Sequence, residues 1–280
     1  MSLNSLLCTK CHQPLDLFDF NPISKRSTIS LGEGNTPIIH LKRLGDHLGL
    51  SNLFGKLEFL NPTGSFKDRG SALLVTMLKK ANIDKVAEDS SGNAGASIAA
   101  YCAKAGIQAT IFAPASAPRT KVQQIAFYGA LVRMVDGTRE QVTKTCKKFC
   151  EETNTIYASH NLNPFFIEGT RSFGYEVTSQ MITPPDHILF PVGNGSLLIG
   201  TWKEYSSKNA NISAGTMPRL HCIQSQLCMP VVNAHNSGGW MSSDQKPITV
   251  AGGIAVENPP RLQQVLQALE ETKGRAVAVK

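Results

Sequence analysis

The sequence predicts an α/β fold with a largely parallel sheet. Apolar runs of strand length alternate with amphipathic helical runs along most of the 280 residues, which is typical of this fold class. Because 41% of the residues are hydrophobic and 18% are charged, the chain can bury a substantial core. Its length suggests one large domain or two moderate ones.

The alternation is clearest in the middle of the chain, where it predicts a wound α/β unit. Glycines at 106 and 129 end two of the expected helices, because glycine readily adopts the left-handed conformation that closes a helix. We expect strands over residues 84–90, 107–115, 130–137 and 154–160, and helices over residues 97–106, 120–129 and 138–153.

The remainder of the chain continues the same pattern. Residues 169–182 and 197–207 are expected to be helical, and Lys42 and Arg43 are expected on an exposed helix. The predicted strands are residues 187–193, 219–225, 248–256 and 275–280. Two stretches rich in Gly, Ser and Asn, residues 206–218 and 233–247, are predicted to be surface loops.

The charge distribution argues against nucleic-acid binding. The formal net charge is +7, but the basic residues are scattered in pairs instead of forming a stripe. This excess leaves a mild preference for anionic small molecules. We also expect a cytoplasmic protein without a membrane association, because no apolar run is long enough to span a membrane and the N-terminus does not resemble a signal peptide.

The seven cysteines fit a reducing compartment, since their number is odd and their spacing forms no disulfide framework. Cys8 and Cys11 have the spacing of zinc ligands, but the residues that follow supply no second pair. Cys146 and Cys150 share one face of a predicted helix, where packing explains them. We therefore predict no metal site.

Lys67 stands at an unusual position for a cation. Residues 61–64 have the composition of a turn, Ser65 is a natural N-cap, and Asp68 completes a capping box, so the helix should begin at Phe66. An ammonium at a helix N-terminus is disfavoured by roughly 0.3–1 kcal/mol. Either Lys67 points into solvent, or it is a neutral amine that forms a Schiff base with a carbonyl compound.

A second stretch, SSGNAG at residues 90–95, joins a predicted strand to a helix. Such a turn offers backbone N–H groups and hydroxyls to an anion at a helix N-terminus, so a carboxylate ligand would fit. The alternative is an ordinary turn that uses glycine for tightness.

A third stretch, GNGS at residues 193–196, leads into a helix expected to begin near Leu197. Its glycines and its serine suit a phosphate group. A Walker loop is excluded because Thr201 stands where a lysine is required, and the dinucleotide fingerprint is excluded because Leu198 replaces its third glycine. The phosphate should therefore not belong to a nucleotide.

A Schiff-base lysine, a carboxylate turn and a phosphate turn together match the needs of pyridoxal phosphate and an amino-acid substrate. The motifs SLGEGNTP, NPTGSFKDRG, SSGNAGAS and PVGNGSLLIG resemble, in order and spacing, those of the fold-type II (tryptophan synthase β-like) pyridoxal-phosphate enzymes, most closely the threonine synthases. The resemblance covers residues 30–280. It implies two wound α/β domains with the cofactor in the cleft between them.

The resemblance also implies a domain organisation. Residues 1–30 would be an N-terminal extension, residues 68–160 a small α/β domain, and residues 31–67 with 161–280 the large cofactor-binding domain. In the family, a Ser, Thr or Cys from a C-terminal segment faces the pyridine nitrogen. Because this chain stops in the apolar run 276–280, the C-terminal part of the large domain is expected to be missing.

Carried over to this sequence, the family's pattern gives each motif a role. Lys67 would form the Schiff base, and Asn93 would bond the 3′-oxygen of the cofactor. The cofactor phosphate would be held by Gly193, Asn194, Gly195, Ser196 and Leu197. The substrate would be bound by Ser90, Ser91, Gly92, Ala94, Thr36, His160 and Asn161.

The reaction that the resemblance implies is the conversion of O-phosphohomoserine and water to threonine and phosphate, by a homodimer. One departure concerns Phe165 and Phe166, which stand where some threonine synthases carry an arginine for the substrate phosphate. Three alternatives on the same scaffold therefore stay open. They are a threonine or serine dehydratase or ammonia-lyase, a cysteate-synthase-like enzyme, and an inactive regulatory protein that binds the cofactor.

Overall fold

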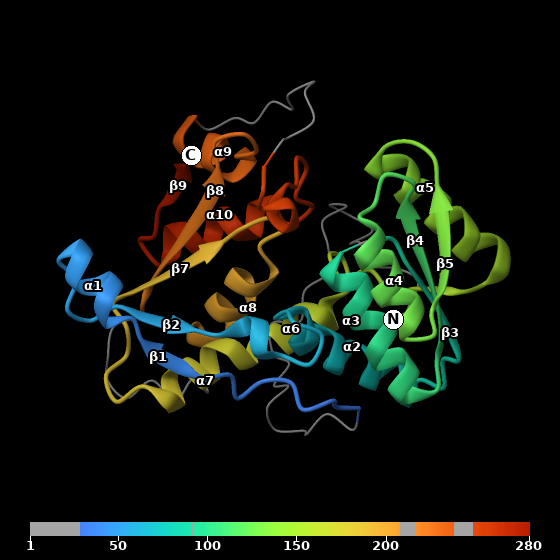
Figure 1. The fold of residues 1–280 in the computed structure, drawn as a ribbon, viewed down its shortest axis with the longest axis horizontal. Coiled ribbons are helices and arrows are strands. Elements are labelled where there is room, and N and C mark those ends of the chain that lie inside the picture. The colour runs from blue at the N-terminus through green and yellow to red at the C-terminus, as the bar shows by residue number, and fades with distance from the viewer. Residues whose placement is uncertain (1–28, 91, 208–216, 238–248) are drawn as a thin grey trace.

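The computed structural model describes residues 29–90, 92–207, 217–237 and 249–280. Two bodies of sheet and helix lie side by side in Figure 1, one built around β3, β4 and β5 and the other around β7, β8 and β9. The α/β class with parallel sheets, predicted from the sequence, is confirmed. Within the described ranges no helix has both the length and the apolar character needed to cross a membrane.

The first body contains a four-stranded parallel sheet in the order β5-β4-β3-β6. Its strands are β3 (Lys85–Glu88), β4 (Gln108–Pro114), β5 (Leu131–Val135) and β6 (Ile156–Tyr157). The helices around it are α2 (Lys67–Lys80), α3 (Asn93–Ala105), α4 (Arg119–Phe127) and α5 (Arg139–Thr153). Its core contains fully buried Ile98, Tyr101 and Ile111. All four strands were predicted from their apolar runs.

The second body contains a three-stranded parallel sheet in the order β7-β8-β9. Its strands are β7 (His187–Pro191), β8 (Arg219–Ser225) and β9 (Ala276–Val279). Its helices are α6 (Pro164–Thr170), α7 (Ser172–Gln180), α8 (Ser196–Tyr205), α9 (Pro230–Ser237) and α10 (Leu262–Glu271). Its core contains Leu198, Leu220 and Val265, none of which is exposed.

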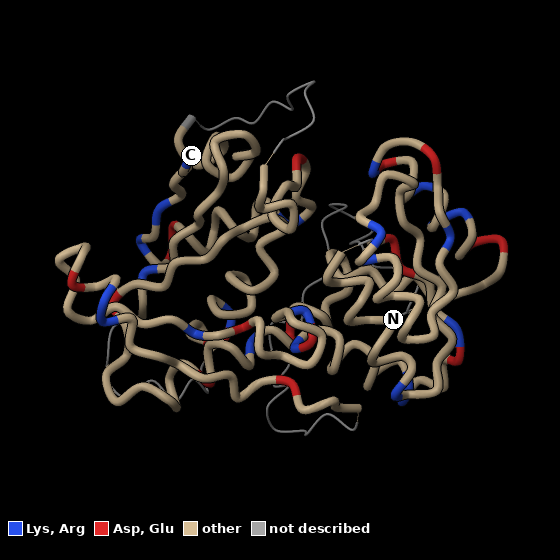
Figure 2. Tube along the Cα trace, in the orientation of Figure 1, with Lys and Arg blue, Asp and Glu red and all other residues tan. Residues whose placement is uncertain are grey.

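An antiparallel pair of strands precedes both parallel sheets in the chain. Strands β1 (Ile38–His40) and β2 (Phe54–Lys56) flank helix α1 (Lys42–Leu48), which carries the two basic residues expected on a helix. Short 3-10 turns follow at η1 (Glu58–Leu60) and, much later, at η2 (Gly252–Ile254). Figure 2 shows acidic and basic residues dispersed over both bodies, in keeping with the scattered charge of the sequence.

Helix α2 joins the two bodies because it packs against α3 on one side and α6 on the other. Leu74 and Leu78 of α2 are buried in the first core, which also includes Phe166 of α6. A side chain at Gly70 would meet the ring of Phe166 at 2.6 Å, so the two helices approach at a glycine. The start of α2, which bears Lys67, is therefore fixed at the junction.

The start of α2 differs from the predicted capping box. The carboxylate of Asp68 accepts from the backbone N–H of Thr63 at 2.7 Å and from its hydroxyl at 2.6 Å, whereas Ser65 Oγ accepts from the N–H of Lys67 at 3.2 Å. The turn at Gly64, with φ of +83°, folds Thr63 back over the helix end. The helix consequently begins at Lys67 and not at Phe66.

Three other predictions were wrong or incomplete. The described part of the predicted strand 248–256 contains the 3-10 turn η2 and no strand. Helix α9 extends into the predicted loop 233–247, whose residues from 238 on lie outside the described ranges. Helix α3 begins at Asn93, four residues before the predicted start. In addition to these three, helix α10 was not predicted.

Candidate active site

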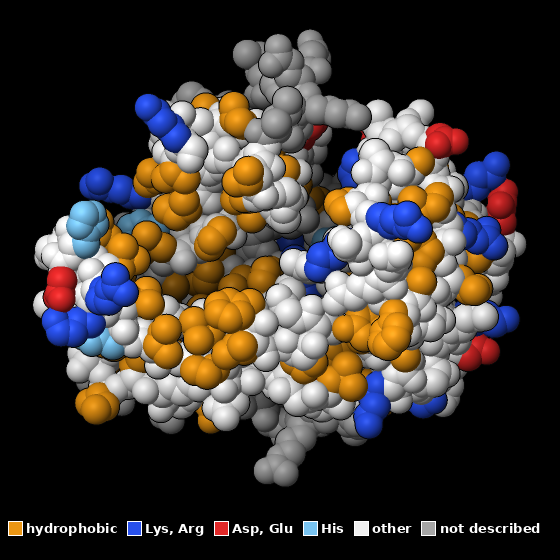
Figure 3. Space-filling model, in the orientation of Figure 1, with side chains coloured by type: hydrophobic (Ala, Val, Ile, Leu, Met, Phe, Trp, Pro, Cys, Tyr) orange, Lys and Arg blue, Asp and Glu red, His pale blue; other side chains and the backbone are white. Residues whose placement is uncertain are grey.

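A large cavity lies between the two bodies. Its volume is about 1930 Å³, and Figure 3 shows that this face of the molecule is hollowed there, with hydrophobic side chains gathered beside the hollow. The cavity brings together most of the residues predicted from the sequence. Those that line it are Lys67, Ser90, Gly92, Asn93, Ala94, His160, Asn161, Gly193, Asn194, Gly195, Ser196 and Leu197.

Two predicted substrate residues are not among those lining residues. Thr36 is buried away from the cavity, where its hydroxyl donates to Glu58 Oε1 at 2.7 Å and accepts from Arg69 Nη2 at 3.1 Å. Ser91 lies outside the described residues, as do Cys8 and Cys11. Thr36 therefore belongs to a buried ionic network, and it is not brought together with the other residues.

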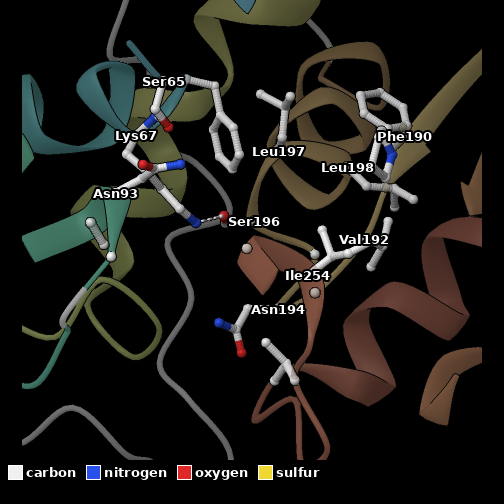
Figure 4. Close-up of a pocket in the computed structure, with 18 of the residues that line it drawn as sticks. Ser65, Lys67, Asn93, Phe190, Val192, Asn194, Ser196, Leu197, Leu198 and Ile254 are labelled. Atoms are coloured by element: carbon white, nitrogen blue, oxygen red, sulfur yellow. Dashed lines mark hydrogen bonds between the residues drawn. The ribbon is translucent and has the colours of Figure 1, made fainter. Parts of the chain in front are cut away.

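Lys67 faces the cavity and not open solvent. Its Nζ lies 3.4 Å from Ser196 Oγ, a contact drawn in Figure 4, and 4.4 Å from the centre of the Phe66 ring. Burial lowers the pKa of Lys67 from 10.5 to about 8, although the charge of Glu88 acts in the opposite direction. This environment makes the neutral amine far more accessible near neutral pH than it is in a solvated lysine.

The glycine turn at residues 193–196 lies on the opposite wall, between β7 and α8. A Cβ at Gly193 would lie 3.1 Å from Ile254 Cα. Gly195 has φ of +79°, and a Cβ there would lie 2.3 Å from Val265 Cγ2. The first N–H groups of α8 have no partner within the helix, and the helix dipole favours an anion at this end. The turn therefore offers a tightly packed cradle suited to a phosphate.

A second helix N-terminus borders the cavity at residues 90–94, where β3 leads into α3. A side chain at Gly95 would collide with the carbonyl oxygen of Ser90 at 1.9 Å, so the turn is packed against its own helix. Ser90 is 7% exposed, and its Oγ accepts from the N–H of Gly92 at 3.4 Å. Asn93 begins the helix, and its amide oxygen accepts from Lys121 Nζ at 2.8 Å.

The structure adds a buried acid and base pair that the sequence did not indicate. Glu88, at the end of β3, has its Oε1 2.5 Å from His160 Nδ1, and it is fully buried. Burial raises the pKa of Glu88 and lowers the pKa of His160. The charge of Lys67 lowers both pKa values, so it opposes the effect of burial on Glu88 and adds to it on His160. The two residues are 72 positions apart, so no local pattern relates them.

Asn161, the next residue, has an unsatisfied amide. Its Oδ1 is buried and has no hydrogen-bond partner among the described residues, whereas its backbone oxygen accepts from Arg261 Nε at 2.6 Å. Arg261 also donates to the carbonyl oxygen of Leu162 at 2.8 Å, which fixes the segment against the start of α10. A buried polar atom without a partner normally meets a ligand or water, so Asn161 is ready to bind one.

Helix α5 contributes two basic side chains to the cavity, Arg139 and Lys147, and Arg139 pairs with Asp89. Asp89 accepts from Tyr157 Oη at 2.7 Å and from Thr143 Oγ1 at 2.5 Å, and Arg139 Nη2 lies 3.3 Å from Oδ2 of the same carboxylate. Lys147 lines the same part of the cavity. The basic pairs in the sequence gave no sign that Arg139 and Lys147 would face this space.

Comparisons with known proteins agree with this geometry. Residues 29–280 match the model of a family described as pyridoxal-phosphate dependent enzymes. A threonine synthase of Methanosarcina acetivorans is 30% identical over 298 residues, covering 97% of this chain and 73% of that protein. A threonine synthase of Methanocaldococcus jannaschii is 32% identical over 265 residues, covering 93% of this chain and 65% of that protein.

Solved structures show the same fold. Maize serine racemase superposes with a TM-score of 0.76 at 23% identity, covering 87% of this chain and 71% of that one. A threonine deaminase of T.th. superposes with a TM-score of 0.73 at 25% identity, covering 87% of this chain and 76% of that one. These likenesses show the fold, and the match over residues 29–280 shows that the chain belongs to the pyridoxal-phosphate-dependent enzymes, with pyridoxal 5′-phosphate as its cofactor.

Proposed function

We propose that the protein is a lyase that converts O-phosphohomoserine and water to threonine and phosphate. The observation that carries the proposal is the pairing of a half-buried lysine with a glycine turn at a helix start, since Lys67 Nζ lies 3.4 Å from Ser196 Oγ. The likeness to threonine synthases supports this choice of reaction. Because the alignments cover 65–73% of the length of the first two of these relatives, the activity remains our inference.

The cavity residues fit the cofactor chemically. Lys67 would hold pyridoxal phosphate through a Schiff base, the turn at residues 193–197 would hold its phosphate, and Asn93 would bond its 3′-oxygen. At Gly193 and Gly195 neighbouring atoms already occupy the positions of a Cβ, so the turn is closely packed on its core side, and the start of α8 and the Ser196 hydroxyl remain to bind the phosphate. When bound, the cofactor supplies an electron sink for negative charge on the carbon atoms of the substrate.

The remaining chemistry belongs to side chains of this chain. Ser90, Gly92 and Ala94 would bind the substrate carboxylate at the start of α3. Once Lys67 is released from the cofactor, its amine would carry protons between substrate carbon atoms. A pKa of about 8 suits this task, because both the neutral and the charged amine are then populated near neutral pH.

A substrate phosphate needs a second anion site, and α5 supplies candidates for it. Arg139 and Lys147 line the cavity, as do the hydroxyl-bearing Thr138 and Thr143. We propose that they act together with His160 and Asn161, which the sequence indicated. The arginine missing at positions 165 and 166 would thus be replaced by one from another helix.

The domain organisation and the assembly are part of the same proposal. Residues 68–160 would form the small domain, and residues 31–67 with 161–280 the large one. The junction at α2 supports a boundary near Lys67, because this helix contacts both bodies. A homodimer is also proposed, on the strength of the family resemblance alone.

Threonine dehydration is the second candidate. It is favoured by the likeness to the threonine deaminase of T.th., at 25% identity. The two reactions differ in their products. Only the first releases phosphate, whereas the second releases ammonia and a keto acid from threonine or serine.

One experiment separates the two candidates. The protein loaded with cofactor is given O-phosphohomoserine, threonine or serine, and phosphate, threonine and keto acid are measured. We expect phosphate and threonine from O-phosphohomoserine, and no turnover by Lys67→Ala. Keto acid from threonine without phosphate release from O-phosphohomoserine would establish the dehydratase instead.

The proposed anion site is tested in the same assay. Arg139→Met should raise KM for O-phosphohomoserine roughly tenfold, because a charged hydrogen bond is lost. Its affinity for the cofactor should not change. Lys144→Met is the matched control, since Lys144 lies on the same helix in an exposed ion pair with Glu140. Equal KM values for the two variants would exclude Arg139 from the site.

A further inference from the structure

Helix α4 sends a lysine to the amide that we place beside the cofactor. Lys121 Nζ lies 2.8 Å from Asn93 Oδ1 and 3.2 Å from Gln124 Oε1. Lys121 is half-buried and is not one of the residues that line the cavity, whereas Asn93 is. The lysine therefore acts on the far side of the amide from the ligand space.

This contact determines which way the amide of Asn93 faces. An ammonium group can only donate hydrogen bonds, so it must meet the oxygen of the amide and not its nitrogen. With the oxygen occupied, the NH₂ group is the part of the side chain left for the cavity. Asn93 and Lys67 both line the cavity, and Figure 4 draws them on the same side of it. The amide can thus donate to an anionic oxygen but cannot readily turn to accept.

Lys121 is itself held in place by the turn that precedes Lys67. Gln124, one helical turn further along α4, accepts from Lys121, and its Nε2 donates to the carbonyl oxygen of Thr63 at 3.4 Å. Thr63 in turn is bonded to Asp68 of α2. A continuous set of contacts therefore fixes Asn93 relative to the helix that bears Lys67.

We propose that Lys121 is a positioning residue of the cofactor site. It holds the amide of Asn93 with its NH₂ group toward the 3′-oxygen of pyridoxal phosphate, and its positive charge strengthens the donor by polarising the amide. The proposal rests on the cofactor-binding role proposed above for Asn93. It does not depend on which amino acid the enzyme converts.

The test uses the cofactor alone as the probe, without substrate. Lys121→Met removes the donor and keeps most of the side chain, Lys121→Arg restores a donor, and Lys104→Met is the control, being an exposed lysine on α3. Three quantities are measured: the dissociation constant for pyridoxal phosphate, the absorption spectrum of the bound cofactor, and the urea unfolding of the cofactor-free protein.

We expect Lys121→Met to weaken cofactor binding about fivefold to tenfold and to shift the absorption band, because the amide loses its fixed orientation. Lys121→Arg should retain most of the wild-type affinity, and Lys104→Met should match the wild type. The unfolding curve of Lys121→Met should stay close to that of the wild type. A loss of affinity that merely follows a loss of stability, and that Lys121→Arg does not restore, would refute a positioning role.

A double-mutant cycle gives the decisive measurement. In an Asn93→Ala background, Lys121→Met should have no further effect on the affinity or the spectrum, because the amide through which it acts is gone. Equal effects of Lys121→Met with and without Asn93 would overturn the proposal. Either result is independent of the assay with O-phosphohomoserine, so this inference and the proposed reaction can fail separately.

Discussion

The lowered pKa of Lys67 is a property of its surroundings. The residue starts a helix, and its amine lies between the ring of Phe66 and the hydroxyl of Ser196. Both the helix N-terminus and the loss of water disfavour the charged form. The sequence predicted the first effect, because a capping serine and a turn precede the lysine. The second effect depends on α8, which lies on the opposite wall of the cavity, and no local pattern could show it.

The lowered pKa of Lys67 predicts how covalent uptake of the cofactor depends on pH. Only the neutral amine attacks the aldehyde of pyridoxal phosphate. With a pKa of about 8, roughly one amine in ten is neutral at pH 7, compared with about one in three thousand for an ordinary lysine. The rate of uptake by the cofactor-free protein should therefore rise with pH and level off above about pH 8.

Stopped-flow absorption measurements from about pH 6 to about pH 11 would follow this rate, since that range spans the lowered pKa of about 8 and the ordinary value of 10.5. Lys67→Ala is the control, and it should show no covalent uptake at any pH. A rate that continues to rise up to the ordinary lysine pKa would mean that Lys67 is solvated and charged in the folded protein.

At the scale of elements, the predictions were good where the pattern is local. The four strands of the first sheet are apolar runs closed by polar or glycine turns, and each was found near its predicted place. The start of α3 was missed because Gly92 and Gly95 are poor helix formers by propensity. That helix begins early because Gly95 lets the carbonyl of Ser90 approach closely, which is a tertiary effect.

The predictions for the second body contain two opposite errors: a helix that was missed and a strand that was predicted but is not formed. Helix α10 has buried or half-buried Leu262, Val265, Leu266 and Leu269 at helical spacing, so the sequence contained a signal for it. The predicted strand 248–256 has β-branched residues but also Gly252 and Gly253, which permit the 3-10 turn η2. Gly193 packs against this turn, so η2 supports the glycine turn that we propose as the phosphate site.

The turns before α8 and α3 each contain a glycine, Gly195 and Gly92, and the two glycines have different roles. Gly195→Ala should lower the free energy of unfolding by about 2–4 kcal/mol, because the left-handed φ of +79° costs about 1–2 kcal/mol and the new Cβ collides with Val265. The side chain points into the core and not toward the ligand. Gly92→Ala should leave stability nearly unchanged, since a Cβ there has no atom within 4 Å.

Urea unfolding of the cofactor-free variants measures this difference. In the Gly195→Ala background, Val265→Ala should restore part of the stability, because it removes the methyl group at 2.3 Å. Gly92→Ala should instead raise KM for the amino-acid substrate, since its methyl group enters the proposed carboxylate turn. Equal stabilities for the two alanine variants would show that the turn before α8 is not packed against α10.

At the scale of the whole molecule, the two bodies are held together by α2 and by a buried ionic network. Arg69 of α2 forms two hydrogen bonds of 2.7 Å with Glu58, which follows β2. It forms two more with Glu176 of α7, at 2.6 and 2.8 Å. Lys56 of β2 also contacts Glu176 at 2.9 Å. The network links strand β2 and the segment after it, helix α2 that carries Lys67, and helix α7 of the second body.

The same network should govern stability in acid. Although burial alone would raise the pKa of Glu176, the hydrogen bonds and charge of Arg69 lower it from 4.5 to about 2. A carboxyl whose folded-state pKa is depressed stabilises the protein above its unfolded pKa, and this stabilisation is lost as the pH falls toward the folded value. The free energy of unfolding should therefore decrease by up to about 3 kcal/mol between about pH 5 and about pH 2 from this group.

Replacing the arginine tests this account. Arg69→Met removes the guanidinium from the half-buried carboxylates of Glu58 and Glu176. Although Lys56 still contacts Glu176, the variant should have a free energy of unfolding lower by about 3 kcal/mol at pH 7. Without Arg69 the pKa of Glu176 is less depressed. As the pH falls toward 4, Glu176 therefore becomes protonated in the variant before it does in the wild type, and the difference in the free energy of unfolding should narrow. Lys42→Met is the control, because Lys42 pairs with Asp46 on the exposed surface, where an ion pair contributes at most about 1 kcal/mol. Urea unfolding at several pH values would reveal the narrowing, and a difference that stays constant from pH 7 to pH 4 would show that Arg69 stabilises the junction by packing and not by charge.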